Sequence, residues 1–247
     1  MSRYSIKEQT MTRPYIVQEK DHIEKAVQRY ILIHDLYADK EGVDDLVDTI
    51  YHTIRFNKNL KWKSGEVSLA TTADVLLDIY AIRSRIYRRI GYDKELPDPI
   101  KGLSYDSYDT ASAVLYIKKD DQITATCRVI FDSEKGLPMD KHFKIDYLRD
   151  EGKRVTELSK LMIIHERRGL NQEFRLLTRG VYEVTLFNGM TTVISAMIEE
   201  HYGLYERFGG FGIEGRLSRY GVLPIAFIVT AWHIEEVSGF FKKLFLP

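Results

Sequence analysis

The feature that most constrains the fold of this 247-residue chain is the alternation of strand-like and helix-like segments after residue 64. Short runs rich in β-branched and aromatic residues indicate strands, and they fall at residues 65–72, 111–119, 122–131, 154–164, 191–198 and 224–232. Apolar residues at three- and four-residue spacing indicate helices, and they fall at residues 75–90, 173–190, 199–208 and 233–245. The order strand, helix, hairpin, strand, helix, strand, helix, strand predicts a mixed α/β fold, with a central sheet flanked by helices.

Capping and turn residues place some boundaries of these segments. Asp74 is the expected cap of the helix at 75–90, and Gly91 ends that helix. The turn Asp120-Asp121 joins the two strands of the hairpin. The glycine-rich segment 209–215 connects the helix before it to the last strand.

The first 64 residues differ from the rest. Residues 1–20 are polar and predict a flexible arm, and residues 21–60 carry the periodicity of two short amphipathic helices. We therefore divide the chain into an N-terminal arm and helical extension, residues 1–64, and a main domain, residues 65–247. Because amphipathic helices normally bury their apolar face, a helical cap on the main core is favoured over a separate docking element.

The composition excludes several classes of protein. Lys plus Arg number 36, as do Asp plus Glu, so the net charge gives no reason to expect a nucleic-acid partner. The single cysteine, Cys127, excludes an internal disulfide, and the seven histidines lack metal-ligand spacing, so no metal is predicted. No apolar run approaches the roughly 20 residues that span a bilayer. The polar N-terminus lacks a signal-peptide core, and we expect a cytoplasmic protein without a transmembrane segment.

Charged residues in apolar surroundings predict an internal ion cluster. Arg83 lies on an apolar helix stripe, Arg128 in an otherwise uncharged strand, and Lys160 in a strand that continues with apolar residues. Isolated buried ions are costly, and the nearest candidate partners in kind and number are Asp106 and Asp109 of the sequence YDSYD, with Glu157 as a further candidate member of the cluster. The alternative is a set of surface salt bridges on a solvated face of the sheet.

The same residues carry a resemblance to a known superfamily. From about Val67 to Trp232 the chain resembles GNAT-type acyltransferases, and its first half resembles the acyl-homoserine lactone synthases and the related N-acyl amino acid synthases. The matching positions are Arg83, Tyr87, Gly91-Tyr92, Asp106, Asp109, Arg128 and Glu157-Leu158-Ser159-Lys160. Tyr92 stands where the lactone synthases carry Trp, and Lys160 where they carry Arg. The resemblance implies a GNAT-like mixed sheet and an acyltransferase activity.

The resemblance also assigns proton transfer to two residues. Acyl transfer needs a neutral amine, and the similar families have a glutamate at the position of Glu157 as the proposed base. A carboxylate in a partly desolvated cleft can accept that proton. Tyr205 lies in a sequence that resembles the Y-x-x-x-G-F element of GNAT proteins, and it is the candidate acid for the leaving thiol. The alternatives are a structural partner of Arg or Lys for Glu157, and packing for Tyr205.

The donor site is expected in HERRGLNQ, residues 165–172, where GNAT proteins place a turn that holds the phosphate of the pantetheine arm. Arg167, Arg168 and Gly169 are the candidate phosphate-binding residues, and a solvated loop is the alternative. Glu166 and Asn171 depart from the usual turn, which favours the single phosphate of acyl carrier protein over the pyrophosphate of coenzyme A. The residues expected to wall an acyl-chain tunnel are Phe143, Leu161, Met162 and Ile163.

These observations predict an N-acyltransferase that moves a long-chain fatty acyl group from an acyl thioester to the amine of a small molecule, an amino acid in the leading interpretation. The co-substrate would be an acyl-phosphopantetheine thioester on acyl carrier protein or coenzyme A, with no tightly bound cofactor. Acyl carrier protein would be the protein partner, and arginines late in the helix at 75–90 would help to dock it: Arg85, Arg88 and Arg89. The ion cluster would form the acceptor site.

Three alternatives to this function stay open. The first is a lactone synthase that uses S-adenosylmethionine, the second is an ordinary GNAT acetyltransferase, and the third is a non-catalytic binding protein with the GNAT fold. The long N-terminal helical segment and the sequence from residue 209 onward favour the N-acyl amino acid synthase over the lactone synthase.

Overall fold

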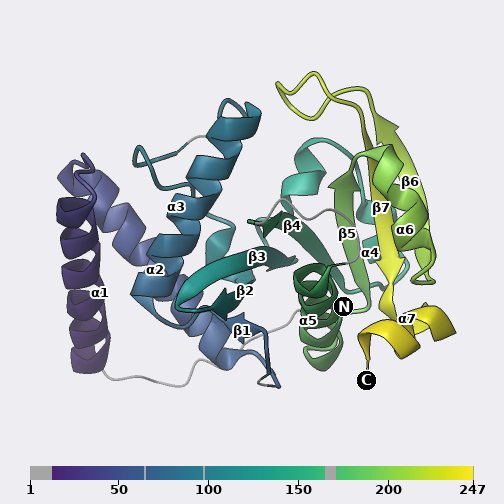
Figure 1. Cartoon of the computed structure of the whole chain (residues 1–247), viewed down its shortest axis with the longest axis horizontal. Coiled ribbons are helices and arrows are strands. Elements are labelled where there is room, and N and C mark those ends of the chain that lie inside the picture. Colours follow the sequence, from purple (N-terminus) through teal and green to yellow (C-terminus); the bar gives the residue numbers. More distant parts are fainter. Residues whose placement is uncertain (1–12, 64, 97, 165–170, 247) are drawn as a thin grey trace.

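The computed structural model describes residues 13–63, 65–96, 98–164 and 171–246, with only the backbone of residues 13–16. Within these ranges the centre is a seven-stranded sheet with the order β1-β2-β3-β4-β5-β7-β6 (Figure 1). The strands are β1 Ser68–Leu69, β2 Ser112–Lys119, β3 Gln122–Phe131, β4 Val155–Ile163, β5 Thr192–Met197, β6 Phe211–Leu217 and β7 Phe227–His233. The α-helices are α1 Arg13–Ile33, α2 Lys40–Asn59, α3 Ala73–Ile90, α4 Asp146–Asp150, α5 Gln172–Phe187, α6 Tyr202–Glu206 and α7 Gly239–Phe245. The predicted mixed α/β class is confirmed.

The sheet opens in its middle, between β4 and β5. These two strands are parallel and pair from Val155–Glu157 to Thr192–Ile194. Beyond this point β4 continues along β3 to Ile163, whereas β5 continues along β7 to Met197. The two strands therefore separate after Glu157, and each presents one edge to the gap between them.

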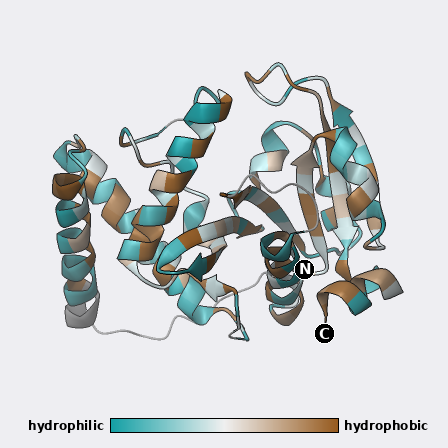
Figure 2. Cartoon of the chain, viewed as in Figure 1, coloured by the Kyte–Doolittle hydropathy of each residue, from teal (hydrophilic) through white to brown (hydrophobic). Residues whose placement is uncertain are grey.

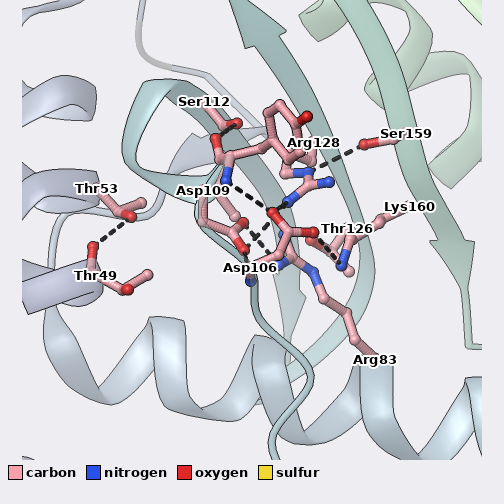
Figure 3. Close-up of polar contacts among 12 residues, drawn as sticks. Thr49, Thr53, Arg83, Asp106, Asp109, Ser112, Thr126, Arg128, Ser159 and Lys160 are labelled. Carbon is pink, nitrogen blue, oxygen red and sulfur yellow. Dashed lines mark hydrogen bonds and ion pairs between the residues drawn. The ribbon is translucent and has the colours of Figure 1, made fainter. Parts of the chain in front are cut away.

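Strand β4 also contains a bulge against β3. The pairing jumps from Thr126↔Met162 to Arg128↔Ser159, which leaves one extra residue in β4. Lys160 lies at this bulge with a φ of 53°, in the left-handed region that a residue with a Cβ seldom adopts. Bulges re-aim side chains next to functional sites, and this one places Lys160 beside Asp106 (Figure 3).

The N-terminal helices form a cap on the main core, as the sequence favours. Helices α1, α2 and α3 lie side by side at one end of the molecule (Figure 1). They share one buried cluster with β2, which includes Ile23, Val27, Leu46, Ile50, Leu76, Tyr80 and Val114. Asn57 of α2 fastens this cap to the sheet, because its side-chain amide donates to the carbonyl of Ser112 at 3.1 Å and accepts from the backbone N–H of Val114 at 3.0 Å. The domain boundary at residues 64 and 65 stays a prediction.

The opposite face of the sheet packs on α5 and α7. Figure 2 shows alternating hydrophilic and hydrophobic bands along α2, α3 and α5, as expected for helices that bury one face. Cys127 is fully buried in this core, as the alternation of its strand predicts. Aromatic side chains close the core at the C-terminal end, where the ring of Phe208 lies 4.8 Å from Phe245 and 5.4 Å from Phe241 between centroids.

Several expected boundaries are wrong in detail. Thr72, not Asp74, occupies the N-cap of α3, and Asp74 lies in the first turn, where it pairs with Arg29 at 2.7 Å. The end of α3 at Gly91 is confirmed, with a φ of 75° that suits glycine. The segment 209–215 is not merely a connection, because Phe211–Leu217 is the edge strand β6. Its glycines hide the strand pattern, and the pairing with β7 supplies the structure that local propensity does not.

Candidate active site

A cavity of about 1440 Å³ lies where β4 and β5 separate. Its walls come from α3, from the loop before β2, from β4 and β5, and from the segment between β6 and β7. Much of the lining is apolar and includes Ile86, Ile90, Leu158, Leu161, Met162, Phe174, Leu204 and Phe227. The charged residues Asp106, Arg128, Glu157 and Lys160 line it as well. The cavity therefore joins a polar, ionisable region to a wall suited to a hydrocarbon chain.

Five predicted residues meet in one ion cluster beside this cavity (Figure 3). Nη1 of Arg83, on α3, lies 2.8 Å from Oδ1 of Asp109. Nη1 of Arg128, on β3, lies 2.6 Å from Oδ1 of Asp106 and 3.2 Å from Oδ2 of Asp109. Nζ of Lys160 lies 3.3 Å from Oδ2 of Asp106. Two aspartates of one short loop thus connect cations from a helix and two strands.

The loop YDSYD is folded around its own carboxylates. The backbone N–H of Asp106 donates to Oδ2 of Asp109 at 3.0 Å, and the N–H of Tyr108 donates to Oδ1 of Asp106 at 2.9 Å. Burial alone would raise the pKa of Asp109, but Arg83 and Arg128 outweigh it and hold that pKa below its ordinary value. Burial also opposes ionisation of Asp106, and Arg128 and Lys160 lower its pKa. Both groups are therefore carboxylates at neutral pH.

The cluster is desolvated and carries a surplus of positive charge. The side chains of Arg83 and Asp109 are fully buried, and those of Arg128 and Lys160 are 3% exposed. Asp106 is 33% exposed and lines the cavity. The five side chains comprise three cations and two carboxylates, so one positive charge lacks a counter-charge within the cluster.

Lys160 is a cation of this cluster whose pKa is lowered. Burial lowers its pKa to about 8, and the neighbouring Arg128 adds to the effect, while Asp106 opposes it. Its ammonium also lies 5.7 Å from the centroid of the Tyr87 ring, within the range of a cation–π interaction. An anion bound in the cavity would restore the balance of charge at this point.

Glu157 lies on β4 at the point where the sheet opens. It is 3% exposed and lines the cavity. Its Oε2 accepts a hydrogen bond of 2.8 Å from the backbone N–H of Met139. Burial raises the pKa of Glu157 to about 7, although the Met139 N–H and the charge of Arg128 oppose the shift. Among the residues the structure describes, Glu157 forms no ion pair, so it lies beside the cluster and not within it.

Tyr205 combines packing with a place in the cavity wall. Its ring lies 5.7 Å from Phe174, 5.4 Å from Phe208 and 5.5 Å from Phe211 between centroids, so the packing role holds. It also lines the cavity. Burial raises the pKa of its hydroxyl to about 12, which keeps the proton on Tyr205 at neutral pH.

The structure adds cavity residues that sequence reasoning missed. Tyr220, between β6 and β7, stacks against His142 with 4.2 Å between ring centroids, and both line the cavity. Burial raises the pKa of the Tyr220 hydroxyl, and the nearby charge of Glu157 adds to this. Asp45 and Thr49 of α2 line the cavity as well. No local pattern distinguishes Tyr220 among the 16 tyrosines.

The predicted acyl-chain residues divide into two groups. Leu161, Met162 and Ile163 line the cavity. Phe143 is placed elsewhere: its ring packs against Gly215 of β6, and it borders the buried cluster around Ile130. The predicted phosphate-binding residues Arg167, Arg168 and Gly169 lie outside the described residues. Asn171, just after them, caps α5, since its side chain accepts from the N–H of Phe174 at 2.7 Å.

The described part of the chain contains no group of three or more His, Cys, Asp or Glu residues that could hold a metal ion. Of the helices in the described ranges, none combines the length and the apolar character needed to cross a membrane.

The site thus lies in a mixed sheet that parts between two parallel strands, with a buried glutamate at the opening. The family model described as N-acyl amino acid synthase FeeM matches residues 78–230, well over half of the chain. The protein therefore belongs to the FeeM family of N-acyl amino acid synthases and is an acyltransferase. No curated protein matches the sequence.

Solved structures agree on the fold. FeeM, an N-acyl amino acid synthase from uncultured soil microbes, superposes with a TM-score of 0.54 at 19% identity, over 73% of this chain and 93% of FeeM. LasI, an acyl-homoserine lactone synthase, superposes with a TM-score of 0.54 at 15% identity, over 73% of this chain and 93% of LasI. BjaI, a coenzyme A-dependent acyl-homoserine lactone synthase, superposes with a TM-score of 0.53 at 18% identity, over 70% of this chain and 80% of BjaI. The predicted GNAT-like resemblance is confirmed.

Proposed function

We propose that this acyltransferase moves a long-chain fatty acyl group from acyl carrier protein to the α-amino group of an amino acid. The observation that carries the proposal is the position of Glu157, a buried carboxylate with a pKa of about 7 in the wall of a large, mainly apolar cavity. Groups with such a pKa are suited to general base catalysis near neutral pH. The FeeM family membership supports the same reaction class.

In the proposed reaction, the acceptor enters as the neutral amine, its nitrogen forms a bond to the thioester carbonyl carbon, and Glu157 accepts the proton that this nitrogen then loses. The C–S bond breaks, and Tyr205, whose hydroxyl keeps its proton at neutral pH, donates that proton to the leaving sulfur to release the pantetheine thiol. Exchange with solvent then removes the proton from Glu157 and returns one to Tyr205. The transfer is direct, so the enzyme needs no covalent acyl intermediate.

The acceptor is proposed to be an amino acid because of the charge in the ion cluster. A carboxylate placed beside Lys160 and Arg128 would neutralise the surplus positive charge described above. Charge-assisted hydrogen bonds of this kind are short and strong in a desolvated site. An acceptor that lacks a carboxylate would leave the surplus uncompensated.

The donor is proposed to be a long-chain thioester because of the cavity's size and its open strand edges. Each methylene buried against Leu161, Met162 or Leu158 adds about 0.8 kcal/mol, which favours long chains. The edges of β4 and β5 that part after Glu157 can pair with the amides of a pantetheine arm, as an added strand pairs with a sheet edge. Arg85 and Arg89 are exposed near the cavity-lining Ile86 and Ile90, where they suit an acidic carrier protein.

The test is product analysis with purified protein and with cells that express it. With long-chain acyl carrier protein and a mixture of amino acids, mass spectrometry should detect an N-acyl amino acid, whose mass identifies both chain and acceptor. Lipid extracts of the cells should contain the same product. A homoserine lactone formed only with S-adenosylmethionine, or no turnover of any acyl thioester, would contradict the proposal.

A further inference from the structure

A second ion cluster surrounds Arg149 of α4. Its Nε and Nη2 lie 2.7 and 3.1 Å from the two carboxylate oxygens of Asp132, just after β3. Its Nη1 and Nη2 lie 2.9 and 2.7 Å from the two oxygens of Asp140. A contact of 3.0 Å joins Nη1 to Asp146 in the same helix. One guanidinium therefore holds two carboxylates from separate segments, each through both oxygens.

Asp140 belongs to the short 3₁₀ helix η2, Pro138–Lys141, which presents an amide to Glu157. Oδ2 of Asp140 accepts from the N–H of Leu137 at 2.7 Å, which closes the first turn of η2. Met139, two residues after Leu137 in the same turn, donates its N–H to Oε2 of Glu157 at 2.8 Å. Leu137 and Met139 are buried with Leu148 of α4, so η2 is packed under the helix that carries Arg149.

We propose that Arg149 is a positioning residue for Glu157. By joining Asp140 to Asp132 it holds η2 in place, so that the Met139 N–H fixes one carboxylate oxygen of Glu157 and leaves the other for the amine of the acceptor. The inference rests on the proposed role of Glu157 as the base.

The charges around Glu157 give this arrangement a measurable consequence. Arg128 of β3, Asp106 of the loop before β2, Asp140 of η2 and the Tyr220 hydroxyl all face it. Burial raises the pKa of Glu157, and the Met139 N–H lowers it because a donor favours the charged form. Release of this amide therefore raises the pKa further and leaves less carboxylate at neutral pH.

The test compares Arg149→Lys with the wild type. Lysine keeps the positive charge but lacks the planar fork that joins two carboxylates, so a change in long-range electrostatics is largely avoided. We expect the pKa of the Glu157 carboxyl, measured by ¹³C NMR with Glu157→Gln for assignment, to rise by about 1 unit. The acidic limb of kcat/KM should move by the same amount, with about tenfold lower activity well below the limb. Hydrogen exchange of the Met139 amide should become faster.

Asp146→Asn is the matched control, because Asp146 pairs with Arg149 but is 72% exposed, and no hydrogen bond or ion pair of the described residues joins its side chain to η2. It should leave the pKa of Glu157, the acidic limb of kcat/KM and the exchange rate of the Met139 amide unchanged.

Asp132→Asn, which weakens the ion pair that anchors Arg149 to the end of β3, should raise the pKa of Glu157 by a smaller amount than Arg149→Lys does. A lower melting temperature in Arg149→Lys with an unchanged pKa of Glu157 would make Arg149 merely structural and overturn the inference. If Arg149→Lys fails to fold, an unchanged pKa of Glu157 in Asp132→Asn would overturn the inference instead. The NMR titration needs no turnover, so failure of the proposed reaction is seen separately, as a wild type without acyl transfer.

Discussion

Glu157 and Lys160 lie three residues apart on β4, and burial moves their two pKa values toward each other. Burial disfavours the charged form of both groups, so it raises the pKa of the carboxyl to about 7 and lowers that of the ammonium to about 8. Between these values the base is ionised while the lysine still carries its proton. The proposed reaction needs both conditions at once.

Glu157→Gln should retain the fold and lose at least about 100-fold in kcat, the scale expected for loss of a general base. The glutamine carbonyl can still accept from the Met139 N–H, so the melting temperature should change little. Steady-state kinetics with acyl thioester and amino acid measures the loss, and Glu206→Gln, on the exposed side of α6, is the control. Unchanged turnover across the pH range would remove Glu157 from the mechanism.

The pH profile of kcat/KM should have two limbs set by these groups. Activity should rise as the pH increases through about 7, where Glu157 loses its proton, and fall as it passes about 8, where Lys160 loses its own. Glu157→Gln should abolish the acidic limb. Lys160→Arg should move the alkaline limb upward, because a guanidinium stays protonated. An alkaline limb that stays near its original pH in Lys160→Arg would show that another group is responsible.

Lys160→Met tests recognition of the acceptor carboxylate. The change should raise the KM for an amino acid about 10- to 100-fold, which corresponds to the roughly 1.5–3 kcal/mol of a hydrogen bond to a charged group. The KM for the corresponding amino acid amide, which has no carboxylate, should hardly change. Lys118→Met is the control, since Lys118 is 45% exposed and pairs with Asp121. Equal losses with both acceptors would argue against a carboxylate site at Lys160.

The ion cluster also has a structural role, because it joins the loop before β2 to a helix and two strands. Arg83 of α3, Arg128 of β3 and Lys160 of β4 all meet the short loop before β2. Without Asp109, two desolvated guanidinium groups would face each other with one carboxylate fewer between them. A buried ion pair adds little net stability, but removal of one partner is strongly destabilising.

Asp109→Ala should lower the free energy of unfolding by about 3–5 kcal/mol, the cost of a buried charge left unpaired. Asp106→Ala should cost less, because its side chain is 33% exposed and water can solvate the remaining cations. Denaturant unfolding measures both changes. Asp121→Asn removes the charge from an exposed pair and should be neutral, because asparagine also tolerates the positive φ of 60° at this position. Equal stability of the Asp109 and Asp121 variants would contradict the structural role of the cluster.

The N-terminal helices and the cavity belong to one packed structure. The family match begins at residue 78, yet α2 lies before it and contributes Asp45 and Thr49 to the cavity wall. The same helix shares a buried cluster with α3, and α3 carries Arg83 and the exposed arginines near the cavity. Changes in the helical cap can therefore reach both the proposed acceptor region and the proposed donor region.

The donor preference should favour long-chain acyl carrier protein over acetyl-coenzyme A in kcat/KM. If exposed arginines dock an acidic carrier, added salt should lower kcat/KM for the acyl carrier protein, because the Debye length falls to about 10 Å at 0.1 M. The double variant Arg85→Glu, Arg89→Glu should show the same loss at low salt, while a free acyl-pantetheine substrate should be unaffected. Faster turnover of acetyl-coenzyme A, with no salt effect on the carrier, would contradict this donor.

Sequence patterns predicted the order of strands and helices along the chain, the main helices and the members of the ion cluster, because these depend on periodicity and on the cost of isolated buried charge. They missed β6, where four glycines between residues 209 and 215 obscure the alternation. They also gave no sign that Phe143 packs against Gly215 of β6, a contact that depends on the path of a loop. The expected cap at Asp74 was wrong because Thr72 is also a preferred N-cap residue, and the helix begins there although the Thr72 side chain makes no capping hydrogen bond.

The sequence by itself determined which side chains must be paired inside the fold and which segments form strands or helices, since both follow from local pattern and from the energy of burial. Only the tertiary structure decided how far β4 and β5 stay together, where the bulge turns Lys160, and that Tyr220 and α2 reach the same cavity. These depend on contacts between segments far apart in the chain, and no local propensity encodes such contacts. The pKa of Glu157 is decided in the same way, because its burial and its hydrogen bond from Met139 exist only in the assembled fold.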